Sequence, residues 1–288
     1  MANKKLKAPV SIPVEKIHPF EGHPYKVLDN DEMNNLIESI QQKGVISPIV
    51  VRPLENTEDE YEIISGHRRL RASVKAGLET VPALIYAVSR DEAAIMLVDS
   101  NLHREHILPS ERAFAYKLKM EAMSRQGYRS DLTSCQFGTK LRTDEIIAEN
   151  STDSARQIQR YIRLTNLIPE LLDLVDEERI AFTPAVELSY LNEVEQADLV
   201  EEIRVCDATP NLSQAQRLRA ISKEEGLTPE HIGEILSEEK ANQREKIRIP
   251  AERIRKYFPK SYTTEQIEEA IIKICESRYR ARQSRDAR

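Results

Sequence analysis

The sequence has few of the residues that interrupt helices or form cross-links. Only 8 of its 288 residues are glycine, well below the usual share of about 7%, and this favours long helices over a loop-rich β fold. The three cysteines, Cys135, Cys206 and Cys275, are scattered and form no CxxC pair. That spacing excludes a disulfide framework and a cysteine zinc site, and it is typical of a reducing compartment.

Long apolar runs are missing too. No run approaches the roughly 18 residues that a membrane span needs, and the lysine-rich stretch 1–8 lacks the apolar core of a secretion signal. We therefore expect a cytoplasmic protein without a membrane partner, associated with a nucleoid or a plasmid if it binds DNA. Zinc and hydrolase motifs are also absent, because His67, His103 and His106 lack zinc-ligand spacing and no GxSxG elbow occurs.

The net charge is acidic, but it is unevenly distributed. Lysine and arginine number 42 against 48 aspartates and glutamates, and the resulting net charge of −6 argues against a uniformly basic nucleic-acid binder. Residues 170–202 hold eleven acids and one base, so the rest of the chain carries a net +4. Residues 65–77 and 278–288 each carry a net +4, although such runs are most often solvated faces.

Strand and helix patterns alternate over residues 1–101. Runs of β-branched residues predict four strands, at 12–17, 49–52, 61–64 and 81–86. Apolar residues at helical spacing predict three helices, at 29–43, 67–77 and 91–101. Asp29 or Asn30 can cap the first helix, and Gly44 fits the position after its end. The alternation indicates a small α/β or α+β unit.

Helical patterns dominate after Pro109. They predict helices at 109–127, 143–149, 154–167 and 169–177, with more filling 184–240. Residues 128–140 and 241–246 have the polar composition of connectors. A last unit follows, extended at 247–249 and helical at 250–257 and 264–279.

Residues 143–167 have the pattern of a helix-turn-helix. A short helix over 143–149 is followed by a polar turn, and Ser154 with Gln157 matches a capping box at the start of a second helix. The polar face of that helix carries the candidate DNA-contacting residues Ser154, Arg156, Gln157, Gln159, Arg160 and Arg163. Arginine can bond guanine edges and glutamine can bond adenine. An ordinary surface helix fits the same residues.

Residues 65–72 read SGHRRLRA and join a predicted strand to a basic helix. A glycine at such a junction lets backbone N–H groups approach an anion, and the helix N-terminus adds positive charge. Gly66 and the residues after it can therefore cradle a triphosphate, although the segment is neither a Walker A loop nor a GxGxxG fingerprint. A basic, exposed helix start is an equally good interpretation.

A second polar patch, DSNLHRE, spans residues 99–105. Asn101 offers an amide oxygen to a hard cation, and Arg104 offers a guanidinium fork to a phosphate. The same residues also fit a simple helix end followed by a capped helix start.

The order of these motifs resembles the ParB/RepB family of plasmid and chromosome partition proteins over roughly residues 8–195. The matching segments stand in family order: GVISPIVVR at 44–52, GHRRLRA at 66–72, NLHRE at 101–105, the helix-turn-helix, and IPELL at 168–172. The resemblance implies an α+β protein. Its parts would be a small N-terminal mixed α/β nucleotide-binding domain (1–127), an all-α helix-turn-helix domain (128–240) and a small C-terminal helical unit (241–288).

The resemblance also implies ligands and partners. Members of the family bind CTP with Mg²⁺, load on a palindromic, centromere-like site in double-stranded DNA and close as a clamp. They work with a ParA-type ATPase, often through a basic N-terminal tail. By resemblance, the nucleotide would be contacted by Gly66, His67, Arg68, Arg69 and Arg104, and Asn101 would help to hold the Mg²⁺.

Two positions depart from the family pattern. His67 stands where the family commonly has the glutamate of GERR, and Ser100 stands where it has the glutamate of ENxQR. In the family the second glutamate is tied to cation handling and CTP hydrolysis. We therefore expect nucleotide binding, with at most a weak CTPase activity.

Other function classes use some of the same features. A transcriptional repressor would use the same helix-turn-helix, and the sequence does not separate it from a partition protein. A ParB-like nuclease is disfavoured because residues 65–77 contain no carboxylate to hold a catalytic metal. A sulfiredoxin is disfavoured because no cysteine lies near GHRR.

The C-terminal unit is expected to dimerise. Its last helix carries an apolar stripe of Ile267, Ile271, Ile274 and Cys275. A unit of this size buries little apolar surface alone, so the stripe predicts a homodimer interface. Packing onto the 250–257 helix is the alternative.

Overall fold

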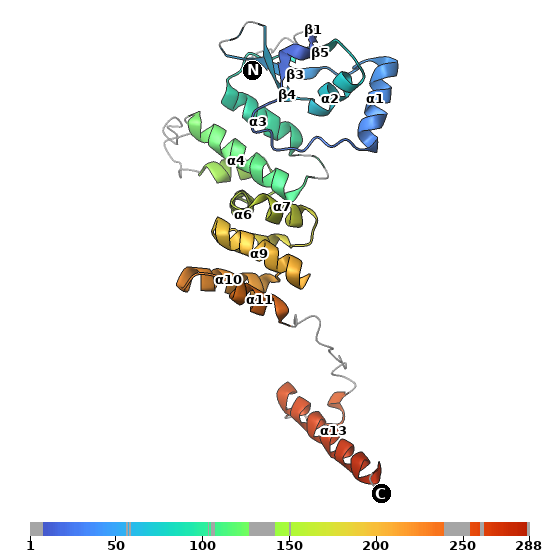
Figure 1. Ribbon diagram of the computed structural model, residues 1–288, viewed down its shortest axis with the longest axis vertical. Helices are drawn as coiled ribbons and strands as arrows, with labels where there is room; N and C mark the ends of the chain where they lie inside the picture. Colours follow the sequence, from blue (N-terminus) through green and yellow to red (C-terminus); the bar gives the residue numbers. More distant parts are fainter. Residues whose placement is uncertain are drawn as a thin grey trace. The chain divides into compact units, whose positions relative to one another are not determined.

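The computed structural model describes residues 8–55, 57, 59–102, 104, 107–126, 142–149, 151–238, 254–259 and 262–286. Its contacts divide the chain into two compact units, Met1–Glu238 and Glu239–Arg288 (Figure 1). The expected connectors at 128–140 and 241–246 and the extended segment at 247–249 lie outside the described residues. The boundary expected near residue 127 therefore stays a prediction.

A five-stranded mixed sheet forms the N-terminal part of the first unit. The strands are β1 (Val10–Pro13), β2 (Ile17–His18), β3 (Ile49–Pro53), β4 (Tyr61–Ser65) and β5 (Thr80–Ile85). Their order is β1-β5-β3-β4-β2. The pairs β1–β5 and β3–β4 are antiparallel, whereas β3–β5 and β2–β4 are parallel. With the helices that follow, this sheet confirms the predicted α+β class.

The prediction of a single strand over 12–17 was wrong. A 3₁₀ turn at Val14–Lys16 interrupts it after Pro13, and the two halves become β1 and β2 at opposite edges of the sheet. Pro13 is still paired with Thr80, and the Val14 N–H donates to the Glu79 carbonyl at 2.9 Å before the turn carries the chain away from β5.

Helices cover both faces of this sheet. Helix α2 (His67–Lys75) lies on one face and α3 (Arg90–Asn101) on the other, while α1 (Asp31–Lys43) packs against α2 and α4 (Pro109–Arg125) packs against α3. Because neighbouring side chains on a strand point to opposite faces, Ile63 packs with Leu70 of α2, whereas Ile64 packs with Leu97 of α3. Asn30, not Asp29, caps α1, because its side chain accepts a hydrogen bond from the Met33 N–H at 3.1 Å.

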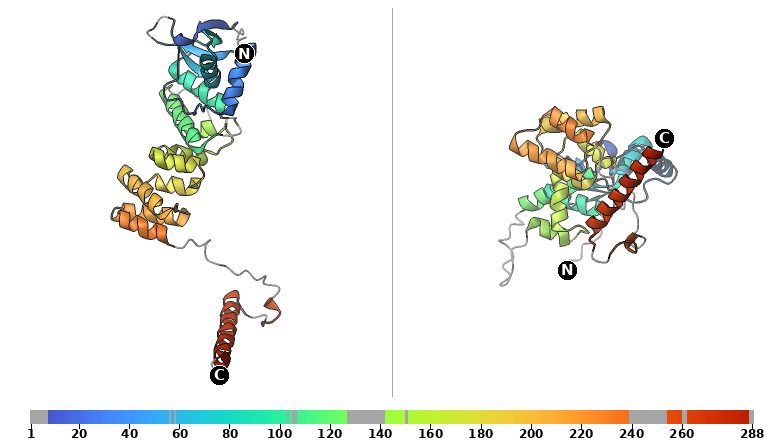
Figure 2. Two further views of the ribbon diagram at one scale, coloured as in Figure 1. Left: turned by 45° about the vertical axis from the view of Figure 1, so that its right-hand side comes forward. Right: turned by 90° about the horizontal axis from the view of Figure 1, so that it is seen from below.

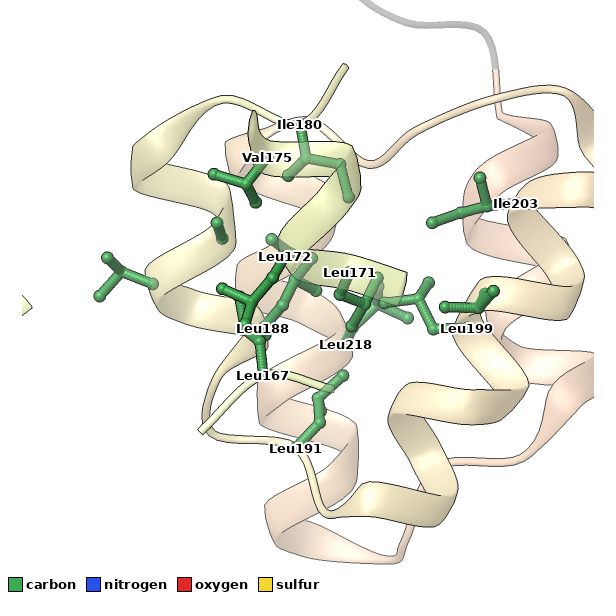
Figure 3. Close-up of a cluster of buried hydrophobic side chains, with 14 of the residues drawn as sticks. Leu167, Leu171, Leu172, Val175, Ile180, Leu188, Leu191, Leu199, Ile203 and Leu218 are labelled. Atoms are coloured by element: carbon green, nitrogen blue, oxygen red, sulfur yellow. The ribbon is translucent and has the colours of Figure 1, made fainter. Parts of the chain in front are cut away.

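The rest of the first unit is helical. Its helices are α5 (Thr143–Glu149), α6 (Ala155–Leu164), α7 (Pro169–Asp176), α8 (Phe182–Leu188), α9 (Glu193–Cys206), α10 (Leu212–Glu224) and α11 (Pro229–Ser237). In Figure 1 and in the left view of Figure 2 they follow α4 as successive layers. Leu171, Leu188, Leu199 and Leu218 are among the apolar side chains that form the shared core of α6 to α11 (Figure 3).

The predicted bounds of α6 were too long at the C-terminal end. The pattern predicted a helix to residue 167, but α6 ends at Leu164. The Thr165 hydroxyl donates to the Ile162 carbonyl at 2.9 Å, and the chain turns there toward α7. Such local side-chain bonds compete with helix continuation.

In the second unit, α13 (Thr264–Asp286) extends beyond the expected end at residue 279. The added residues include arginine, alanine and glutamine, which are good helix formers. Of the helix expected at 250–257, the described residues show helical backbone at Ile254 and Arg255. None of the helices in the described ranges is long and apolar enough to cross a membrane.

A buried carboxylate fastens α7 to the start of α4. Asp176 accepts hydrogen bonds from the Ser110 N–H at 3.0 Å and from the Ser110 hydroxyl at 2.6 Å. The ammonium group of Lys26 lies 3.3 Å from the same carboxylate. The Asp176 side chain is only 7% exposed and Ser110 is 5% exposed, so the two Ser110 donors have little access to water if the carboxylate is removed.

We predict that Asp176→Ala lowers the free energy of unfolding by roughly 2–3 kcal/mol, because it leaves buried donors unsatisfied. Asp173→Ala is the matched control, since Asp173 also pairs with Lys26 at 3.3 Å but is 64% exposed. Its loss should cost about 0.5 kcal/mol or less. Equilibrium unfolding in urea measures both, and equal losses in the two variants would contradict this account of the contact.

Candidate nucleotide pocket and DNA-binding helix

The residues singled out at 66–69 and at 101 and 104 line one pocket, although they come from two segments of the chain. The pocket has a volume of about 270 Å³. Its lining residues are His23, Tyr25, Lys26, Val27, Ser65, Gly66, His67, Arg68, Arg69, Ser100, Asn101 and Arg104. The structure therefore brings the GHRR motif, the end of α3 and the loop before α1 to a single cavity.

The GHRR motif reaches the pocket through a tight turn at Gly66. Gly66 lies between β4 and α2 with φ of 103° and ψ of 25°, a left-handed conformation that favours glycine. A Cβ at this position would lie 2.9 Å from Cγ2 of Ile49. The turn aims the N-terminus of α2 into the pocket, where unpaired N–H groups attract anions.

The three arginines of the pocket have different partners. Arg69 donates to the carbonyl oxygens of Ser47 and Pro48, both at 2.6 Å, and so it holds the loop before β3. Arg68 forms an ion pair with Glu32 of α1 at 3.0 Å on an exposed surface. Arg104 is exposed and lies 5.8 Å from the centre of the Tyr25 ring. Arg104 and Arg68 are therefore the guanidinium groups most available to a ligand.

The pocket lining favours an anion. Among the described residues that line it, none is aspartate or glutamate, whereas Lys26, Arg68, Arg69 and Arg104 are cationic. The described part of the chain also contains no cluster of three or more His, Cys, Asp or Glu residues that could hold a metal. This set of side chains matches the charge of a phosphate chain.

Asn101 is the lining residue with an amide oxygen. Its side-chain nitrogen donates to the Leu97 carbonyl at 2.7 Å and to the Ser100 hydroxyl at 3.2 Å, and within the described part of the chain no recorded hydrogen bond engages its amide oxygen. Mg²⁺ usually takes one or two protein carboxylates in addition to phosphate oxygens. The residues therefore fit Mg²⁺ only through Asn101, and such a cation would depend on the phosphates for its other ligands.

Two imidazole rings that lie against each other at an angle of 38° form part of the wall. The ring centres of His23 and His67 are 3.7 Å apart, and Nε2 of His67 is buried without a hydrogen-bond partner among the described residues. Burial, followed by the charges of His23 and Arg104, lowers the pKa of His67 to about 3. Burial also lowers the pKa of His23. Both rings are therefore neutral in the free protein at physiological pH.

The sequence patterns did not indicate His23, Tyr25 or Lys26. These residues stand in an irregular segment between β2 and α1, where periodicity carries no information. The sequence offered one indication of these binding residues, namely that a histidine, a tyrosine and a lysine occur together in one loop. Loops held by a rigid scaffold often carry binding residues. The segment is held in place by the Lys26 N–H, which donates to Glu111 of α4 at 2.7 Å.

The helix-turn-helix pattern corresponds to α5 and α6. Ser154 caps α6 by accepting from the Gln157 N–H at 3.3 Å. Only one of the two hydrogen bonds of the capping box forms, because the Gln157 side-chain oxygen accepts a hydrogen bond from Arg160 at 3.2 Å instead. The turn is fixed to α4, since the Tyr116 hydroxyl donates to Asp153 at 2.6 Å.

The predicted DNA-contacting side chains of α6 divide into two groups. Arg156 and Gln159 are exposed, and Gln159 donates to Asp144 of α5 at 3.0 Å. Arg160 and Arg163 are half-buried. Arg160 donates to the Thr183 hydroxyl at 2.9 Å, and Arg163 donates to the Ser189 carbonyl at 3.2 Å. Arg156 is thus the cation of α6 with the greatest freedom to reach a ligand.

Comparison with known proteins points to one family. A family model described as the ParB N-terminal domain matches residues 2–102. A nucleoid occlusion protein of Listeria monocytogenes serotype 4b is 32% identical over 202 residues, which cover 67% of each chain. The nucleoid occlusion protein of Listeria innocua is 32% identical over 195 residues, 67% of this chain and 62% of the relative. The chain thus spans somewhat less than two thirds of that relative.

A chromosome-partitioning protein and a solved structure are also similar. The protein Spo0J of Thermus thermophilus is 30% identical over 171 residues, covering 59% of this chain and 56% of that one. The C-terminally truncated partitioning protein ParB of Caulobacter crescentus, complexed to the centromeric parS site, is 22% identical. It covers 73% of this chain and 98% of that one, with a TM-score of 0.43.

The neutral His67 predicts a pH-dependent stability. Its pKa is lower in the folded chain than the ordinary value of 6.5, so the unfolded chain binds a proton that the folded chain does not, and acid destabilises the fold. Between pH 7 and 5.5, the wild type should lose roughly 1 kcal/mol more stability than His67→Gln. Urea unfolding at both pH values measures this, and an identical loss in the two proteins would contradict it.

Proposed function

Because this chain belongs to the ParB family, we propose that it is a DNA-binding partition protein that binds a palindromic, centromere-like site and is regulated by CTP. The observation that carries the proposal is the occurrence, within one compact unit, of a basic pocket free of carboxylates among its described lining residues and an arginine-bearing helix-turn-helix. Either feature alone would fit many proteins, but together they match the two ligands of a partition protein.

The second helix of the pair, α6, would enter the major groove of DNA. Arg156 is exposed near its N-terminal end, where recognition helices make base contacts. Asp153 in the preceding turn is held by Tyr116, and Asp144 of α5 is bonded to Gln159. These contacts fix the helix before DNA arrives, so binding would require little further ordering of the protein.

The pocket would bind the triphosphate of CTP. Backbone N–H groups at the start of α2 and the side chains of Arg68 and Arg104 would contact phosphate oxygens. Arg68 would exchange its exposed partner Glu32 for the ligand, whereas Arg69 would keep the loop at Ser47 in place. Bound with the nucleotide, Mg²⁺ would neutralise part of the phosphate charge, and Asn101 would supply the protein's amide oxygen to it.

The contacts of Lys26 offer a route from the pocket to the helices. Its side chain lines the pocket, yet its ammonium group pairs with Asp173 and Asp176 of α7 at 3.3 Å each. A triphosphate would compete with these carboxylates for the same cation. Nucleotide binding would therefore weaken the contact between the pocket loop and α7, as a clamp that opens and closes on DNA requires.

Turnover of the nucleotide is not part of the proposal. Ser100 stands where the family has a glutamate, and its hydroxyl donates to the Leu97 carbonyl at 2.9 Å. The described lining residues therefore supply no carboxylate to act as a general base. CTP would act as a ligand that shifts the conformation of the clamp.

A palindromic site calls for two copies of the chain. In α13, Ile274 is 54% exposed, and Ile267 and Ile271, which lie on the same face of the helix, are partly buried. We propose that this apolar surface forms the homodimer. A ParA-type ATPase would be the further partner, and the N-terminal tail expected to contact it begins in residues outside the described range.

Arg104→Ala should weaken CTP binding about tenfold or more, because it removes a charge-assisted bond to a phosphate. Arg125→Ala is the matched control, since Arg125 pairs with Asp91 at 2.9 Å and does not line the pocket. Calorimetry with CTP and Mg²⁺ measures the affinities. Unchanged CTP affinity in Arg104→Ala would refute the assignment, and no CTP binding by the wild type at millimolar concentration would remove nucleotide regulation.

Arg156→Ala should weaken binding to the palindromic site by about tenfold, the effect expected of a lost base or phosphate contact of about 1–3 kcal/mol. Arg179→Ala, which removes an exposed arginine from the acidic stretch after α7, should leave affinity unchanged. Fluorescence anisotropy with a duplex selected by footprinting provides the measurement. Equal affinities for wild type and Arg156→Ala would show that α6 does not read DNA.

A further inference from the structure

Tyr190 lies between two arginines that come from different helices. The guanidinium carbon of Arg163, in the last turn of α6, is 3.8 Å from the centre of the Tyr190 ring. The guanidinium carbon of Arg219, in α10, is 3.5 Å from it. Tyr190 itself follows α8 and is 44% exposed. Three helices thus place two cations around one aromatic ring that faces solvent.

The charges of this cluster are not balanced within the described residues. Arg219 pairs with Glu187 at 2.7 Å. Arg163 donates only to the neutral Ser189 carbonyl, and its Nε is buried without a hydrogen-bond partner. Two guanidinium groups held near each other repel, and a partly exposed cation–π contact is only weakly attractive. The two arginines therefore carry more positive charge than their described partners neutralise, and the packing of the helices does not require this charge.

The cluster continues the surface of α6. Arg163 lies about two turns beyond Arg156 on that helix. Recognition helices are flanked by contacts to the phosphate backbone, which position the protein without reading the sequence. A guanidinium group suits this task because its planar fork matches phosphate oxygens.

We propose that Arg163, Tyr190 and Arg219 form a phosphate clamp that extends the DNA interface from α6 to α8 and α10. The inference rests on the proposed function of α6. The two arginines would contact the DNA backbone, and Tyr190 would be a positioning residue that holds both guanidinium planes. Contact with phosphates makes the contribution independent of base sequence and sensitive to salt.

The test is the salt dependence of DNA binding. Affinity for the palindromic site and for an unrelated duplex is measured by fluorescence anisotropy between 50 and 200 mM KCl. Arg219→Gln should weaken both complexes by a similar factor, and it should reduce the slope of log K against log salt by about 1. Over this range, a slope change of that size makes binding about fourfold less sensitive to salt.

Arg217→Gln is the matched control. Arg217 lies on the same helix, is similarly exposed at 50% against 42% for Arg219, and pairs with Glu238 at 2.6 Å. Residues two apart on a helix do not share a face, so this variant should keep the wild-type slope. Arg219→Lys retains the positive charge and should also keep most of the slope. If Arg219→Gln does not fold, Arg163→Gln gives the same readout.

The outcomes separate this inference from the proposed function. A wild-type slope in Arg219→Gln, with affinity for both duplexes unchanged, overturns the clamp while leaving α6 as the DNA-binding helix. Weakening confined to the palindromic site also overturns it, because it would indicate base reading in place of backbone contact. If the wild type binds neither duplex, the proposed function of α6 fails and the clamp fails with it.

Discussion

Strand β4 ends at Ser65 and helix α2 begins at His67. The turn between them depends on the absence of a side chain at Gly66. The left-handed backbone and the close approach of Ile49 leave no room for a Cβ. This single constraint places the N-terminus of α2, with His67 and Arg68, at the mouth of the pocket. A looser junction would direct the same positive charges into solvent, where they would not converge on one ligand.

The other walls of the pocket depend on contacts made far along the chain. The loop that carries Tyr25 and Lys26 is held by Glu111 of α4 and by Asp176 of α7, and Asp176 also caps the start of α4 through Ser110. The pocket and the helical region therefore share structural elements. This sharing gives a ligand in the pocket a physical means of altering the helices that would hold DNA.

Sequence patterns predicted those elements that local signals determine. Asn30 and Ser154 act as helix caps, and Gly66 marks the strand-to-helix turn, because each effect arises within a few residues. The single strand predicted over 12–17 was wrong, since the chain leaves the sheet after Pro13 and returns as β2 at the opposite edge. Sequence patterns also did not predict that Lys26 lines the pocket or that arginines of α6 pack on α8. Their partners lie tens of residues away along the chain, and no periodic pattern relates the two segments.

In the proposed function, one unit of the chain binds a nucleotide at the Gly66 turn and DNA at α6. Hydrogen–deuterium exchange of the full chain, measured separately with saturating CTP and with its palindromic duplex, tests it most directly. We expect CTP to slow exchange in peptides covering residues 21–27 and 65–70, and DNA to slow exchange over 154–164. No slowing by CTP over 21–27 and 65–70, or no slowing by DNA over 154–164, would contradict it.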